Sequence, residues 1–476
     1  MKRKYSTILI GFLVLANIFS CKKLVQVDTP ITSVNEKLVY TNDAQAIAVL
    51  TGLYTKMSTA GLSYSEGASS TSLTGSLSSD DLIPINSNNQ TRNEYFSNSL
   101  TPLTPTAWAD IYNKIYVVNA ALEGISKSSA LTPSIKQQLI GEAKFMRAFN
   151  YFYLVNLYGD VPFPLSTDYK INSQLGRTSA QIVYEQIVMD LKEAQAELSE
   201  DYLSSNLSTT TMERVRPTKA AATALLARVY LYTKAYLNAE IEASKVINNT
   251  SRFSLVTVDE VFKKNNKEAI WQIMPVGIPE SFTANTKEGL AFVPISSLDD
   301  YALSNSLISA FEMGDKRRTN WIGIFDGKPF PNKYKIGRIN SESQEYSTVL
   351  RLAELLLIRA ESRAQQNNIV GAIEDLNLIR KRARSEVTLS VPNPLPDLSL
   401  NLDKSSVLSA IARERQVELF TEWGHRWFDL KRTDRATSVL SAINGKNWQV
   451  TDELYPIPQT EIDLAPNLRE HQNPGY

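Results

Sequence analysis

The sequence predicts a mostly α-helical protein in which two loop-rich parts are mounted on a helical scaffold. Apolar residues recur at helical spacing over long stretches, and few segments alternate with the period of two that a strand would show. Two stretches, 61–107 and 271–340, are rich in Ser, Asn, Gly, Pro and aromatic residues and lack sustained periodicity. We therefore expect one domain over residues 40–476, with its scaffold at about 40–60, 108–250 and 346–435.

The N-terminus predicts export and a lipid anchor. Lys2, Arg3 and Lys4 precede the apolar run Thr7–Phe19, which at 1.5 Å per residue is too short to cross a hydrocarbon core of about 30 Å. Residues 1–20 are therefore expected to be a signal peptide. Cys21, the only cysteine, directly follows and fits a lipobox loosely, so 21–39 would be a lipid anchor and tether. The alternative is a plain secretory signal with an incidental cysteine.

The scaffold helices carry recognisable start signals. Asn42 and Gln45 form a possible capping box before a first helix through Met57, and Thr132 precedes a proline at the first position of another helix. Thr178 with Gln181 is a second capping box. The helices expected up to this point are 108–125, 133–158 and 182–198.

Two later pairs of helices resemble each other. The first spans 217–233 and 236–247, the second 346–366 and 370–383, and a last helix covers 405–421. Small residues recur twelve positions apart in each pair, at Ala227 and Ala239 and at Ala360 and Ala372. This spacing lets antiparallel helices cross closely, as in tetratricopeptide repeats. Two unrelated helical hairpins are the alternative.

Composition excludes several kinds of chemistry. With 50 Lys and Arg against 50 Asp and Glu, the chain has no basic excess for nucleic acid. One Cys and two His, His425 and His471, exclude disulfides, cysteine clusters and multi-histidine zinc sites. We expect no cofactor and no catalytic metal; the scattered Asp and Asn residues leave a structural calcium open. Carboxylate chemistry remains, for example a glycosidase using two of Asp80, Asp81, Asp299 and Asp300.

Several segments, in order along the chain, resemble the SusD/RagB family of outer-membrane nutrient-binding lipoproteins of Bacteroidetes. The strongest are IARERQVELFTEWGHRWFDLKR at 411–432 and LYPIPQTEI at 454–462, followed by NPGY at 473–476. EAKFMRAFNYFYLVNLYGDVP at 142–162, RLAELLLIRAE at 351–361 and VDTP at 27–30 are also typical of the family.

This resemblance implies a SusD-like fold with tetratricopeptide-like hairpins, anchored in the outer membrane through lipidated Cys21 and exposed at the cell surface. It further implies a non-enzymatic protein that captures oligosaccharides and acts as a lid on a SusC-like TonB-dependent β-barrel transporter. Some members capture peptides instead, as a RagB-like protein would. Lys22 and Lys23 depart from the acidic residues that often follow the lipid cysteine in surface-exposed members.

A glycan site needs aromatic planes for sugar C–H faces and polar side chains for hydroxyl groups. The resemblance places ligand contacts in the early loop and in the irregular segment before the Arg351 helix. The late segment offers Trp321, Phe325, Lys333 and Tyr334. We expect His425 to be a packed residue rather than a catalytic one. The alternative for the two loop segments is that they are solvated or face a partner rather than a ligand. The expected ligand contacts are Tyr64, Tyr95 and Trp321 for stacking and Asp80, Asn89 and Arg92 for hydrogen bonds.

Overall fold

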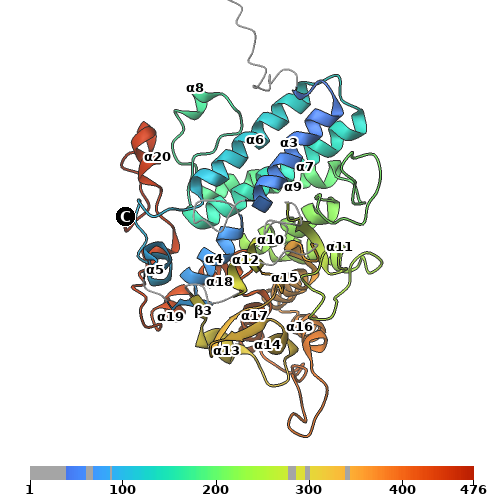
Figure 1. Cartoon of the computed structure of the whole chain (residues 1–476), viewed down its shortest axis with the longest axis vertical. Helices are drawn as coiled ribbons and strands as arrows, with labels where there is room; N and C mark the ends of the chain where they lie inside the picture. The colour runs from blue at the N-terminus through green and yellow to red at the C-terminus, as the bar shows by residue number, and fades with distance from the viewer. Residues whose placement is uncertain (1–38, 60–67, 86–87, 277–285, 295–300, 338–342) are drawn as a thin grey trace, which may run out of the picture.

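The computed structural model describes residues 39–59, 68–85, 88–276, 286–294, 301–337 and 343–476. The described chain is mostly helical, with short strands in two-stranded antiparallel sheets, as the sequence predicts (Figure 1). The signal peptide, Cys21 and most of the tether lie outside the described residues. Within those ranges, no helix combines the length and apolar character needed to span a bilayer.

The first helices form a bundle at one end of the molecule (Figure 1). The capping prediction for the first helix is confirmed in part, because the Gln45 amide donates to Asn42 Oδ1 at 3.0 Å. The second capping prediction is wrong by one residue: Ser179, not Thr178, precedes the helix. These helices are α3 (Asp43–Thr59), α6 (Trp108–Lys127), α7 (Pro133–Tyr158) and α9 (Ala180–Glu197), with the short α8 (Tyr169–Asn172) between the last two.

Two helical hairpins continue from this bundle: α10 (Lys219–Tyr232) with α11 (Tyr236–Ile247), and α15 (Leu352–Gln365) with α16 (Ile369–Ala383). Helix α11 packs against α15, so the hairpins stack side by side. Ala227, Ala239, Ala360 and Ala372 are completely buried. Small side chains therefore lie in the interhelical core, where the spacing argument requires them.

The helix expected from residue 346 instead begins at Leu352. The preceding residues form β6 (Ser347–Arg351), which pairs with β2 (Ala269–Ile273). Four of the five β6 residues are buried. Its residues, Ser-Thr-Val-Leu-Arg, do not alternate between apolar and polar side chains, so periodicity alone does not mark this strand.

The C-terminal part wraps back over the scaffold. Gly424 has φ 74°, and this left-handed residue opens α18 rather than capping α17, which ends earlier. Trp427 and Phe428 are buried in the main hydrophobic core. The elements here are α17 (Lys404–Leu419), α18 (His425–Arg432), α19 (Ala436–Leu440), η2 (Val450–Glu453), α20 (Gln459–Leu464) and η3 (Pro466–Leu468).

The loop-rich parts contain more regular structure than the sequence predicts. The Ser-rich stretch expected to be a loop includes helix α4, whose Leu73 and Leu77 are buried. A Cβ at Gly75 would lie 2.9 Å from Gly424 Cα, so α4 runs very close to the turn before α18. The Ser and Gly residues of α4 have low helix propensity, but their small size permits close packing in the folded protein. This packing overrides their low helix propensity. The elements are α4 (Ala68–Ser78), β1 (Leu82–Pro84), α5 (Gln90–Ser97), α12 (Lys287–Phe292), β3 (Tyr301–Leu303), α13 (Asn305–Ala310), α14 (Lys316–Asn320), β4 (Ile322–Phe325) and β5 (Lys328–Pro331).

Candidate functional site

Strand pairing brings the early and late loop-rich segments together. β1 pairs antiparallel with β3, with Leu82 opposite Leu303 and Pro84 opposite Tyr301. Helix α5 packs on β1, and β5 of the β4–β5 hairpin lies beside β3. Segments more than 200 residues apart in sequence thus form one face of the molecule, here called the α5–hairpin face: α5, the β1–β3 pair and the β4–β5 hairpin.

Both ends of helix α5 are fixed by side chains. Asn89 caps its N-terminus by accepting a hydrogen bond from the Arg92 amide at 3.1 Å. At the other end Lys446 Nζ donates to the carbonyl oxygens of Leu77, Ser78 and Phe96 and to Asn98 Oδ1. Lys446 thereby joins the C-terminal ends of α4 and α5, where unpaired carbonyl groups favour a cation.

Arg92 and Asn89 are the two predicted contacts that the structure places partly exposed on this face. The Arg92 guanidinium lies over the ring of Tyr301, 5.1 Å from its centre. The Arg92 backbone amide donates to Oδ1, the single side-chain oxygen of Asn89, whereas the Asn89 NH₂ group remains a potential donor. Tyr64 lies outside the described residues.

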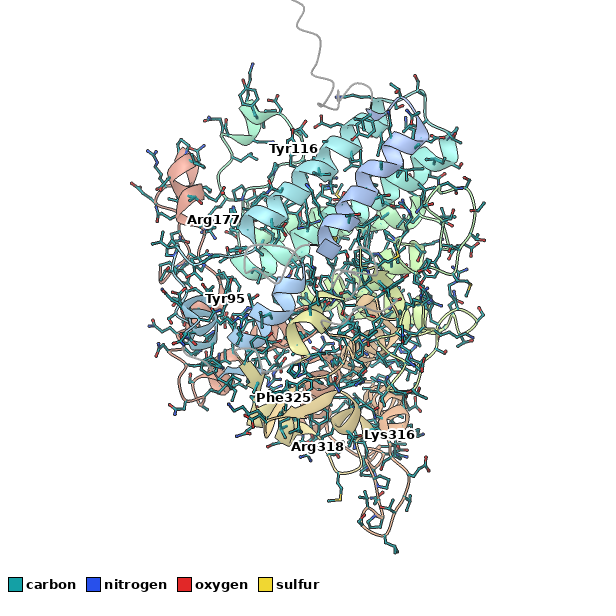
Figure 2. The ribbon with its side chains drawn as sticks, in the orientation of Figure 1. Tyr95, Tyr116, Arg177, Lys316, Arg318 and Phe325 are labelled. Carbon is teal, nitrogen blue, oxygen red and sulfur yellow. The ribbon has the colours of Figure 1, made fainter. Side chains whose placement is uncertain are left out.

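Tyr95 was expected to stack on a ligand, but it is 1% exposed. Its hydroxyl donates to the Pro105 carbonyl at 2.9 Å, and its ring packs edge-on against Tyr455 with 5.5 Å between centres. Figure 2 labels this residue on α5. Tyr95 therefore fastens α5 to the body, and the expectation of an exposed ring is wrong.

Trp321 is also wrong as an exposed stacking residue, because its side chain is completely buried. Its indole nitrogen donates to the Val258 carbonyl at 2.8 Å, and Phe262 packs edge-on at 5.6 Å. Lys333 Nζ lies 4.9 Å from its ring. Trp321 precedes β4 and roots the hairpin in the core. Lys333 and Tyr334, which the late segment also offered, are buried with it.

Asp80 is the third expected contact that the structure places in the interior. It is 2% exposed and receives two hydrogen bonds from Arg426, at 2.5 and 2.8 Å. Ser306 and Gln416 donate to it as well. Asp80 thus ties the residues before β1 to α13, α17 and α18, which leaves it no surface for a hydroxyl group.

The side chains that the hairpin does present are Ile324 and Phe325. Ile324 is 67% exposed. Phe325, the last residue of β4, is partly exposed and is labelled in Figure 2. Asp326 and Gly327 have φ 48° and 71°, the paired left-handed conformation of a two-residue hairpin turn. The Asp-Gly dipeptide between apolar residues was the sequence signal that could have located this hairpin.

A buried ion-pair network holds the hairpin to the scaffold. Arg317, which has no exposed surface, donates to Asp315, Glu414 and Glu418. Lys333, just after β5, pairs with Glu422 at 2.5 Å. The family-typical carboxylates of α17 are therefore structural anchors for the candidate site.

The carboxylate pair considered for glycoside hydrolysis is also internal. Asp80 is held by Arg426, and Asp81 is 1% exposed. Asp299 and Asp300 lie outside the described residues. His425 is buried at the start of α18, and burial holds its pKa well below the usual range, consistent with the expected packed residue.

The Asp81 carboxyl predicts a pH-dependent stability. Burial, then repulsion from Asp80, raises its pKa to about 7. In the unfolded chain it titrates near about 4, so between these values only the folded state holds the proton and stability falls as pH rises. Asp81→Asn is expected to raise the urea midpoint at pH 8, by an amount that shrinks toward pH 5. Exposed Asp259→Asn is the control; a gain for Asp81→Asn that does not vary with pH would contradict the assignment.

Comparison with known proteins identifies the family of this chain. A model described as starch-binding associating with outer membrane matches residues 32–231, and a SusD family model matches residues 300–476. The chain belongs to the SusD/RagB family. One relative of this SusD/RagB chain is SusD-like protein P38 of Formosa agariphila. The two are 25% identical over the full length of both chains.

Solved SusD structures share the fold. A SusD superfamily protein from Bacteroides vulgatus matches with a TM-score of 0.76 at 19% identity, covering 91% of this chain and 99% of its own. A laminarin-binding SusD-like protein matches at 0.74 and 24% identity, covering 92% and 100%. Surface glycan-binding protein A from Bacteroides fluxus matches at 0.73 and 21%, covering 90% and 99%. At these identities the likeness shows the SusD fold alone.

Proposed function

We propose that this SusD/RagB protein is an outer-membrane lipoprotein that captures oligosaccharides and passes them to a TonB-dependent SusC-like transporter. The observation that carries the binding part is the joining of the early and late segments by the β1–β3 pair. Signal-like residues 1–20 and Cys21 support anchoring, since two acyl chains suffice for stable attachment. A surface glycan-binding protein and a laminarin-binding SusD-like protein share this fold, which supports oligosaccharides as the ligand class.

The proposed contacts combine the two kinds of group that a sugar needs. Phe325 offers a partly exposed ring and Ile324 an apolar side chain, while Arg92 and Asn89 offer hydrogen-bond donors. Aromatic rings suit sugar C–H faces, and guanidinium and amide groups suit hydroxyl oxygens. Tyr64 remains a proposed stacking residue. We infer binding rather than catalysis, because Asp80 and Asp81 are buried and Arg426 already neutralises the first.

Calorimetric titration with neutral plant, host and microbial oligosaccharides, beside a peptide digest, tests this function. We expect glycan binding that Phe325→Ala and Arg92→Ala each weaken about tenfold, equal to about 1.4 kcal/mol. Tyr116→Ala is the matched control, because Tyr116 is 57% exposed on α6, far from the hairpin in Figure 2. Binding of peptides alone would overturn the ligand class, and glycan binding unchanged by both variants would overturn the site.

A further inference from the structure

A cavity separate from the α5–hairpin face lies among the scaffold helices. It has a volume of about 650 Å³ and is bounded by the turn between α10 and α11 and by α15, α17 and α18. This volume lies within the range of about 300–1,000 Å³ typical of small-molecule sites. None of its lining residues belongs to α5 or the β4–β5 hairpin.

The cavity has an excess of positive charge. Two of its three carboxylates are engaged, because Arg432 pairs with Glu361 at 2.5 Å and with Asp429 at 2.8 Å; the third, Asp434, is exposed. Lys234 and Arg435 also line it, and in the described part of the chain their side chains make no hydrogen bond or ion pair. Burial, then the neighbouring Arg426, lowers the pKa of Arg435, while Asp80 and Asp429 act in the opposite direction.

Arg415 supplies the strongest indication of a ligand. It lines the cavity, is 2% exposed, and uses its Nε to donate to Asp429 Oδ2 at 2.6 Å. Its Nη1 and Nη2 atoms are buried and have no hydrogen-bond partner among the residues described. Leaving buried guanidinium donors unpaired is costly, and their fork geometry matches an oxyanion with two oxygens.

The remaining wall is suited to a ring rather than to a bare ion. Tyr236 contributes a partly exposed aromatic side chain, and Leu408 contributes a partly exposed apolar one. Aromatic and apolar side chains in the same cavity as a guanidinium with two unpaired nitrogen atoms fit a sugar ring that carries an acidic group.

We propose that this cavity binds an acidic sugar unit, whose carboxylate or sulfate accepts hydrogen bonds from Arg415 with Lys234 and Arg435 at the rim. This inference rests on the proposed glycan-capture function and extends it to charged oligosaccharides. Carboxylate and sulfate present the same oxyanion chemistry to the guanidinium, so the source of the charge is distinguished by the probes.

The test is calorimetric titration of the purified chain with glucuronate, galacturonate, glucose 6-sulfate, glucose and inorganic sulfate. At least one acidic sugar should bind while glucose does not. Arg415→Gln should abolish this binding, and Lys234→Gln and Arg435→Gln, which break no hydrogen bond or ion pair among the described residues, should each weaken it about threefold to tenfold as partners of an anion. Arg413→Gln removes an exposed charge from the same helix outside the cavity and should have no effect.

Failure of every acidic sugar to bind, binding of inorganic sulfate alone, or sugar binding unaffected by Lys234→Gln and Arg435→Gln would overturn the inference. Neutral oligosaccharides serve as the internal reference. If they still bind in a Phe325-dependent manner, only the acidic-sugar cavity is wrong; if neither class binds, glycan capture itself is wrong.

Discussion

Replacing Arg351 by Met is expected to lower the free energy of unfolding by about 3–5 kcal/mol, because it leaves three buried carboxylates without their shared cation. Arg351 is 2% exposed and donates to Glu268 at 3.0 Å, to Glu418 at 2.6 Å and to Glu422 at 2.8 Å. Chemical denaturation of the variant beside the parent measures the loss.

Lys381→Met is the matched control for that experiment. Lys381 and Asp397 form an ion pair at 3.5 Å, but their side chains are 58% and 43% exposed. Removing such a pair should cost less than about 1 kcal/mol. If Arg351→Met costs no more than this control, the buried network does not hold the late segment to the scaffold.

Trp321→Ala is expected to destabilise the protein by about 3–5 kcal/mol, the usual cost of deleting a fully buried large aromatic side chain. The change removes the bond to the Val258 carbonyl and the contacts with Phe262 and Lys333. It also empties the space at the base of the hairpin. Thermal or urea unfolding gives the magnitude.

Trp448→Ala is the control for this experiment, because it removes an indole side chain that is not in the core. Trp448 is only partly buried, and its ring meets Trp427 edge-on at 5.9 Å, so its removal should cost clearly less. A ligand-stacking Trp321 would show the opposite signature: normal stability with lost glycan binding. That result would overturn the core position reported above.

The helical scaffold could be predicted because local signals and burial agree. Helices α7 and α11 both match their predicted bounds, and in α7 the Thr-Pro pair marks the first residue. Helix α4 escaped prediction because its stability depends on the close approach of Gly75 to Gly424, which are distant in sequence. Strand β6 escaped because it is buried on both faces and so shows no alternation.

The two predicted site segments lie together, but three of the six expected ligand contacts are buried. Tyr95, Trp321 and Asp80 lie among polar and aromatic neighbours in sequence, yet each has its partner far along the chain, in Tyr455, Val258 and Arg426 respectively. Sequence shows which side chains could contact a sugar; only tertiary pairing decides which ones remain exposed. Phe325 remains partly exposed next to the tight Asp-Gly turn that ends β4.

The most direct test of glycan capture at the α5–hairpin face is hydrogen–deuterium exchange with and without a saturating neutral oligosaccharide that binds in the calorimetric panel. The account predicts slower exchange in 88–97 and 322–331, with little change in the scaffold helices α9 and α16. Protection confined to other segments, with none in α5 or the β4–β5 hairpin, would contradict it.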